Sequence, residues 1–147
     1  MVAKLIESGL ALVAAPLGEK GPTKHGWNLR HNAITSPSDV AKLQGKNVGL
    51  AHAYCSPSPT CAIDVDDYPL ALRWLSNAGF DLKAELFRPE SVVLTSGKRY
   101  SIKLLFRLPT GVGPQLTRQI MSSENKMIIE FRCASRLGQT VQDLIPP

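Results

Sequence analysis

The sequence predicts one α+β domain, in which short helices and strands follow each other in an irregular order. Its 147 residues suffice for one domain with a proper core and are too few for two comfortable ones. The composition, 44% hydrophobic and 20% charged, is ordinary for a globular protein. The clearest local signal is a hairpin over residues 91–108, where two apolar runs flank a basic turn. Helical segments and hairpins are mixed along the chain, which favours α+β over a doubly wound fold.

In the first half, residues 3–14 have a helical apolar pattern interrupted by Gly9, although residues 10–17 could equally form a strand. Ser36 and Pro37 suit the N-cap and first position of a short helix. The elements expected next are a loop over 18–27, that helix to about residue 44, a turn at 45–47 and a strand over 48–54.

In the second half, Tyr68 and Pro69 open a helix whose expected buried face includes Trp74, and Gly79 ends it. The remaining elements are a loop over 56–60, strands over 61–65, 91–95, 101–108 and 126–132, a last strand within 138–145, a mixed connection over 80–90, a break at 109–114 and a short helical stretch to about 121.

The net charge of +5 is unevenly distributed along the chain. Residues 1–97 carry nine basic and nine acidic side chains, whereas residues 98–147 carry eight basic and three acidic ones. This asymmetry suggests a polyanionic partner, a triphosphate or a nucleic acid, although a solvated basic face would give the same pattern.

The location expected from the sequence is the cytoplasm, with no membrane association. No apolar run approaches the ~20 residues that cross a bilayer, and the N-terminus is a poor signal peptide. Three cysteines, an odd number, favour a reducing compartment. His52, Cys55, Cys61 and Cys133 could form a zinc site, but their spacing contains no C-x-x-C pair.

The most informative motif is Asp64-Val65-Asp66, at the end of an apolar run. In a strand, both carboxylates project from one face and Ile63 and Val65 from the other. Two like charges so close repel each other unless a positive charge lies between them, and a divalent ion with oxygen ligands is the simplest one. The alternative is that residues 66–69 form a turn and a helix cap.

A third carboxylate, Glu130, interrupts the apolar strand 126–132, where an unpaired charge is costly. It could bind metal with the other two, or form a structural salt bridge with Arg132 or Arg107. Lys103 interrupts another apolar strand and shares its face with Ser101. Three carboxylates and two cations on one face suit metal-dependent triphosphate chemistry.

Four segments, residues 47–53, 62–67, 101–103 and 128–132, carry a resemblance to a known family. Their order resembles the primase-polymerase (prim-pol) domain of the archaeo-eukaryotic primase superfamily, most closely the bifunctional DNA primase/polymerase N-terminal domains of phage, plasmid and prophage replication proteins. The resemblance covers nearly the whole chain. It implies an RRM-like mixed or antiparallel sheet packed on helices.

The resemblance also implies site residues. Asp64, Asp66 and Glu130 match the catalytic, metal-binding acids, and Lys103 stands where the family usually has a histidine. A lysine can hold a phosphate but cannot carry a proton near neutral pH as a histidine does. The expected nucleotide-binding residues are Ser101, Lys103, Arg132, Lys98 and Arg99.

The implied activity is template-directed nucleotidyl transfer on single-stranded DNA, with two Mg²⁺ or Mn²⁺ ions and NTP or dNTP substrates. Residues 1–147 would be one catalytic domain, an N-terminal piece of a larger replication protein with a helicase domain or subunit as partner. A catalytically idle binding module and a metal-dependent nuclease remain alternatives. The sequence leaves the sugar preference, the template start signal and the oligomeric state open.

Overall fold

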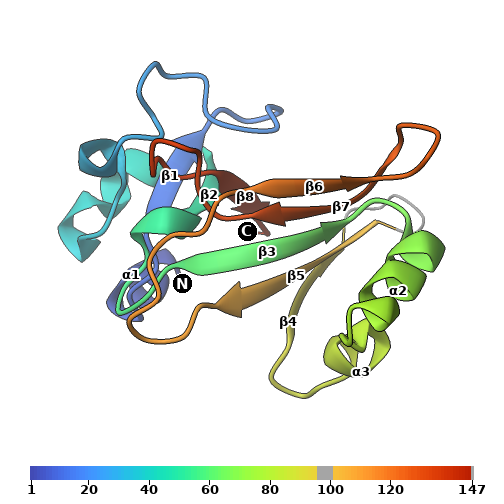
Figure 1. Cartoon of the computed structure of the whole chain (residues 1–147). Coiled ribbons are helices and arrows are strands. Elements are labelled where there is room, and N and C mark those ends of the chain that lie inside the picture. Colours follow the sequence, from blue (N-terminus) through green and yellow to red (C-terminus); the bar gives the residue numbers. More distant parts are fainter. Residues whose placement is uncertain (96–100, 147) are drawn as a thin grey trace. The chain divides into compact units, whose positions relative to one another are not determined.

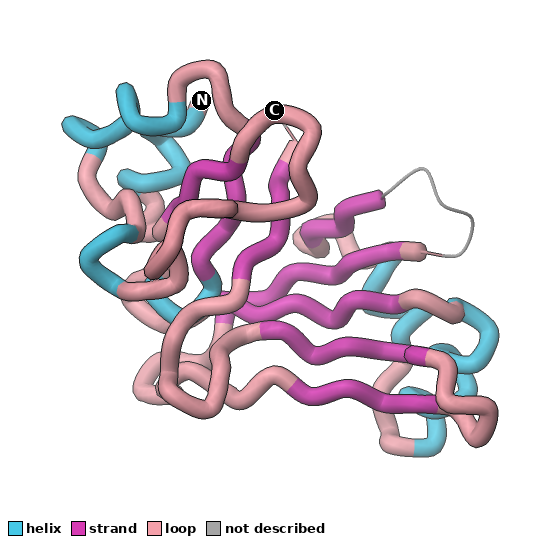
Figure 2. The backbone as a smooth tube through the Cα atoms, turned by 90° about the horizontal axis from the view of Figure 1, so that it is seen from above, coloured by secondary structure: helices cyan, strands magenta, loops and turns pink. Residues whose placement is uncertain are grey.

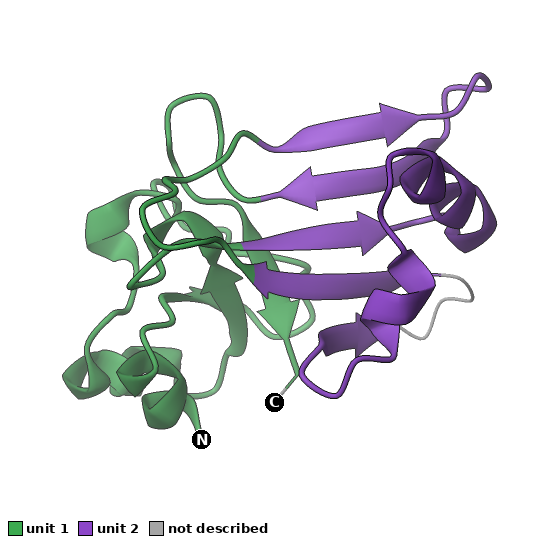
Figure 3. Ribbon diagram, turned by 60° about the horizontal axis from the view of Figure 1, so that its bottom comes forward, with its two compact units in different colours: residues 1–60, 107–116, 133–147 green, residues 61–106, 117–132 purple. Residues whose placement is uncertain are grey.

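The computed structural model of the chain describes residues 1–95 and 101–146. It contains two compact units, each with its own sheet, which Figure 3 distinguishes by colour. Unit 1 comprises residues 1–60, 107–116 and 133–147, and unit 2 comprises residues 61–106 and 117–132. Both sheets contain antiparallel strand pairs and both units contain helices, which confirms the predicted α+β class.

Unit 1 contains a three-stranded sheet with the order β1-β2-β8 and antiparallel pairing. Leu12 of β1 pairs with Leu50 of β2, and both are almost fully buried, so apolar side chains join these two strands. The elements of unit 1 are α1 (Val2–Glu7), β1 (Leu12–Ala15), the 3-10 helices η1 (Arg30–Asn32), η2 (Pro37–Leu43) and η3 (His52–Tyr54), β2 (Asn47–Ala51) and β8 (Gln142–Ile145) (Figure 1).

Most expectations for unit 1 are confirmed. The N-terminal stretch forms both predicted elements, α1 and then β1, with Gly9 between them at φ +86°. Ser36 is the N-cap of η2, which is a 3-10 helix, and its side chain accepts a hydrogen bond from the Ser38 amide. The strand expected over 48–54 was too long, because the chain turns into η3 at His52.

Unit 2 contains a five-stranded sheet with the order β4-β5-β3-β7-β6, so β3 is the central strand. The pairs β4–β5, β3–β7 and β6–β7 are antiparallel. The elements of this sheet and its helices are β3 (Thr60–Val65), α2 (Tyr68–Asn77), α3 (Leu82–Leu86), β4 (Val92–Thr95), β5 (Ile102–Arg107), β6 (Arg118–Met121) and β7 (Met127–Arg132). Figure 2 shows neighbouring strands of this sheet side by side.

One face of this sheet packs on α2 and α3, as Figure 3 shows. Val65, Leu104 and Ile129 project from the strands into a core that Ala71 and Leu75 of α2 complete. Because neighbouring residues of a strand point to opposite faces, Asp64 and Glu130, which adjoin Val65 and Ile129 in sequence, lie on the face away from the helices.

Three expectations for unit 2 need correction or refinement. Residues 118–121 form the strand β6, where a helical stretch was expected, because they pair with β7 and Ile120 packs on the core. Trp74 is 42% exposed and does not belong to the buried face of α2. The connection 80–90 contains the helix α3, which Asp81 caps.

The order β3-α2-α3-β4-β5, with β3 beside β5, is the β-α-β-β arrangement that begins an RRM-like unit. Between β5 and β7, over residues 108–126, all of them described, the chain forms no helix, and β6 within this range pairs with β7 as a hairpin. Among the described residues, no helix has the length and apolar character that crossing a membrane requires.

Candidate active site

Asp64 and Glu130 lie directly opposite each other in the register between β3 and β7. Opposed residues of an antiparallel pair project from the same face, with their Cβ atoms about 4.5–5.5 Å apart. This face is the one away from α2 and α3, since Ile63 and Val65 on β3 pack on the core. Two of the three predicted acids are therefore neighbours.

Lys103, on the adjacent strand β5, forms an ion pair with Asp64, with 3.0 Å between Nζ and Oδ2. The two side chains are 20% and 21% exposed, so the pair is mostly shielded from water. The basic residue that was expected to hold a phosphate thus neutralises one of the predicted metal ligands.

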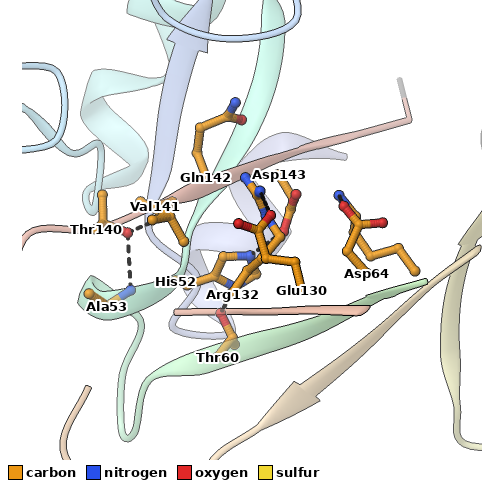
Figure 4. Close-up of polar contacts among 12 residues, drawn as sticks. His52, Ala53, Thr60, Asp64, Glu130, Arg132, Thr140, Val141, Gln142 and Asp143 are labelled. Carbon is orange, nitrogen blue, oxygen red and sulfur yellow. Dashed lines mark hydrogen bonds and ion pairs between the residues drawn. The ribbon is translucent and has the colours of Figure 1, made fainter. Parts of the chain in front are cut away.

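Glu130 is 9% exposed and is held through both carboxylate oxygens. Arg132 Nη1 donates to Glu130 Oε2, and Gln119 Nε2 on β6 donates to Oε1 at 2.9 Å. In Figure 4 the guanidinium of Arg132 lies at the Glu130 carboxylate. This ion pair was the structural alternative predicted for Glu130. Gln119 was missed, because its role depends on its register opposite Glu130.

Asp66 lies just beyond the end of β3, at an exposed bend. The amides of Asp66 and Asp67 both donate to the carbonyl of Ile128, at 3.1 and 3.4 Å, which ends the regular pairing with β7. Asp67 is the N-cap of α2, with Oδ1 accepting from the Leu70 amide at 3.1 Å. The predicted cap is therefore Asp67.

Of the remaining predicted nucleotide contacts, the structure describes Ser101 alone. Ser101 is half-buried and immediately precedes β5. Lys98 and Arg99 lie outside the described residues.

The donor chemistry of this face fits a hard divalent ion, since Asp64 and Glu130 offer adjacent carboxylate oxygens. Each carboxylate, however, already binds a basic side chain. Within residues 1–95 and 101–146, no three His, Cys, Asp or Glu side chains are grouped closely enough to hold a metal ion. A metal at Asp64 and Glu130 would thus compete with Lys103 and Arg132 for these carboxylates.

Comparison with protein families identifies a family for nearly the whole chain. Residues 2–147 match the family of bifunctional DNA primase/polymerase N-terminal domains, known as Prim-Pol. The chain belongs to this family. The match spans both units and confirms the family inferred from the order of the motifs. Comparisons with curated proteins and with solved structures give no match. Family membership places the chain among domains of DNA primases and polymerases.

This Prim-Pol domain also contains a buried polar cluster in unit 1. His52 is fully buried, with Nε2 2.8 Å from Asp143 Oδ2 and Nδ1 2.9 Å from Thr60 Oγ1 (Figure 4). Thr60 Oγ1 also donates to Cys55 Sγ at 3.4 Å. Both ring nitrogens of His52 are thus engaged by protein atoms, so this arrangement does not support the zinc site considered from the sequence.

Proposed function

We propose that this Prim-Pol domain catalyses template-directed nucleotidyl transfer on single-stranded DNA, making primers and extending them as a DNA polymerase. The observation that supports this most is the juxtaposition of Asp64 and Glu130 on one face of a sheet, flanked by Lys103 and Arg132. Acids that can hold metal and cations that can hold phosphates are the two requirements of phosphoryl transfer.

The metal-binding residues in this proposal are Asp64, Glu130 and Asp66, and two Mg²⁺ or Mn²⁺ ions are the expected cofactors. Bound there, the ions would activate the attacking hydroxyl and stabilise the leaving pyrophosphate. Glu130 is kept in one orientation by Gln119. Asp66, at its bend beyond β3, has the exposure that a ligand approached from solvent needs.

Nucleotide binding falls to the basic side chains in the same proposal. Lys103 and Arg132 lie beside the carboxylates and can contact the phosphates of an NTP or dNTP. Ser101, Lys98 and Arg99 are proposed as further contacts. A helicase domain or subunit is the proposed partner in replication.

The direct test is incorporation of a labelled nucleotide on a single-stranded DNA template with Mg²⁺ or Mn²⁺. We expect product from the wild type, and a loss on the order of 100-fold or more for Asp64→Asn and for Glu130→Gln. Glu124→Gln is the matched control, because Glu124 is 73% exposed and pairs only on the surface with Lys126. Equal product from the wild type and both variants would contradict the proposal.

A second candidate is a catalytically idle module that binds nucleotides or DNA. It is favoured by the ion pairs themselves, since Lys103 and Arg132 neutralise both carboxylates. In that case the wild type binds the template but incorporates nothing with either metal. Degradation of the template in place of synthesis would instead indicate a metal-dependent nuclease.

A further inference from the structure

The two ion pairs of the candidate active site differ from ordinary surface pairs in their exposure. The side chains of the Lys103–Asp64 and Arg132–Glu130 pairs are 11–23% exposed. Those of the Lys126–Glu124 pair are 76% and 73% exposed. Exposed pairs contribute little and are screened by salt, whereas a shielded carboxylate that loses its cation is left in an unfavourable state. Asp64 and Glu130 therefore need a positive partner.

A basic side chain and a divalent ion compete for that position. Lys103 Nζ lies 3.0 Å from Asp64 Oδ2, which is hydrogen-bonding distance to an oxygen that would also ligate metal. Arg132 occupies Oε2 of Glu130 in the same way. A divalent ion placed between the two carboxylates would repel both cations strongly at this range. Metal entry thus requires their departure.

The charges of these four residues cancel, two positive against two negative. Adding divalent ions alone would leave an excess of positive charge on a partly shielded face. A fully ionised triphosphate brings negative charge of roughly the same size as that of two divalent ions, and Lys and Arg are its preferred protein ligands. The phosphates therefore provide a destination for Lys103 and Arg132 when they leave the carboxylates.

We propose that Lys103 and Arg132 are exchangeable counter-ions, which hold Asp64 and Glu130 in the free protein and transfer to the triphosphate when metal enters. This inference rests on the proposed function and adds a form of regulation to the same site. Its consequence is that the basic side chains suppress metal binding in the free domain. Gln119 keeps its hydrogen bond to Glu130 Oε1 throughout and preserves the orientation of that carboxylate.

The distinguishing prediction is a pair of opposite effects from one substitution. Lys103→Gln removes a cation that competes with metal, so the free variant should bind Mn²⁺ at least about fivefold more tightly than the wild type. The same variant should bind a non-hydrolysable nucleoside triphosphate, measured without metal, at least about fivefold more weakly. Arg132→Gln should show the same two changes.

Isothermal titration calorimetry measures both affinities, and circular dichroism checks that each variant is folded. Lys126→Gln, which alters an exposed pair, serves as the control and should retain wild-type Mn²⁺ affinity within about twofold. If one of the two Gln variants does not fold, the other carries the test.

The proposal is overturned if the folded Gln variants bind Mn²⁺ no more tightly than the wild type, or if they lose metal and nucleotide affinity together. Failure of the proposed function has a different signature. In that case Asp64→Asn leaves Mn²⁺ binding unchanged and the wild type incorporates no nucleotide, whatever the effect of Lys103→Gln.

Discussion

Gln119 lies directly opposite Glu130 in the register of β6 and β7, and its Nε2 donates a 2.9 Å hydrogen bond to Glu130 Oε1. Arg132 holds the other oxygen of the same carboxylate. If Arg132 moves to a bound nucleotide, Gln119 becomes the neighbour that keeps Glu130 in position. Gln119 is therefore a positioning residue in the proposed mechanism, contributed by a strand that the sequence pattern did not reveal.

Gln119→Leu should weaken Mn²⁺ binding and nucleotide incorporation by about 10–100-fold, the usual effect of removing a residue that orients a metal ligand. The nucleotide KM should change little, since Gln119 contacts the acid and not the cations. Calorimetry and steady-state incorporation kinetics measure these quantities. Gln115→Leu is the matched control, because the Gln115 side chain is exposed and its Nε2 donates to the nearby Gly113 carbonyl at 3.0 Å, away from Glu130. An unchanged Mn²⁺ affinity would rule out the positioning role.

The neighbouring carboxylates Asp66 and Asp67 should separate into a functional and a structural residue. Asp67→Ala should lower the free energy of unfolding by about 1 kcal/mol, because it removes the N-cap of α2. Asp66→Ala should cost less than Asp67→Ala, since Asp66 is exposed and does not cap α2, and should reduce nucleotide incorporation. Urea denaturation and the incorporation assay test both variants. A stable but fully active Asp66→Ala protein would remove Asp66 from the proposed site.

The pair His52–Asp143 should stabilise unit 1. Asp143→Ala leaves the Nε2 group of a fully buried histidine without its 2.8 Å partner, which should cost about 1–3 kcal/mol in the free energy of unfolding. Urea denaturation measures the loss. Glu124→Ala provides the comparison, because its exposed pair with Lys126 should change stability by less than about 0.5 kcal/mol. Similar small effects from both substitutions would show that the buried pair is dispensable.

Cys133 should make stability fall at alkaline pH. Burial raises the pKa of this thiol above its ordinary value of 9.0, and the hydrogen bond from the Gln115 amide opposes the shift only in part. The folded protein thus holds the thiol proton more tightly than the unfolded chain. Its contribution to stability is complete below pH 9.0 and is lost as the pH rises through the raised pKa.

Urea denaturation of the wild type and of Cys133→Ala across this pH range measures the effect. As the pH rises, the free energy of unfolding of the wild type should fall relative to that of Cys133→Ala, because only the wild type carries this thiol. Parallel curves for the two proteins would show that Cys133 has no such linkage.

Local pattern predicted the elements whose signals lie within a few residues. The two β-rich runs on either side of residues 96–100 form β4 and β5 and pair as expected. The proline at position 69 and the glycine at position 79 bracket α2 correctly. Alternation along 61–65 placed Asp64 away from the core, and the order of the motifs was enough to recognise the family.

Elements that depend on distant partners were not predicted. Residues 118–121 have little strand character of their own and form β6 because β7 offers a pairing edge. The strand predicted over 48–54 ends at Ala51, and the next residue, His52, begins η3 and bonds Thr60 and Asp143, the latter 91 residues further along the chain.

The sequence by itself determined the α+β class, the family and the residue types at the candidate site, because periodicity, capping and motif order are properties of neighbouring residues. Only the tertiary structure decided which charges meet. Asp64 faces Glu130, Lys103 binds Asp64 and Gln119 binds Glu130 because strand register brings together positions far apart in the chain. Register is set by the burial of the whole sheet face, and no single motif contains that information.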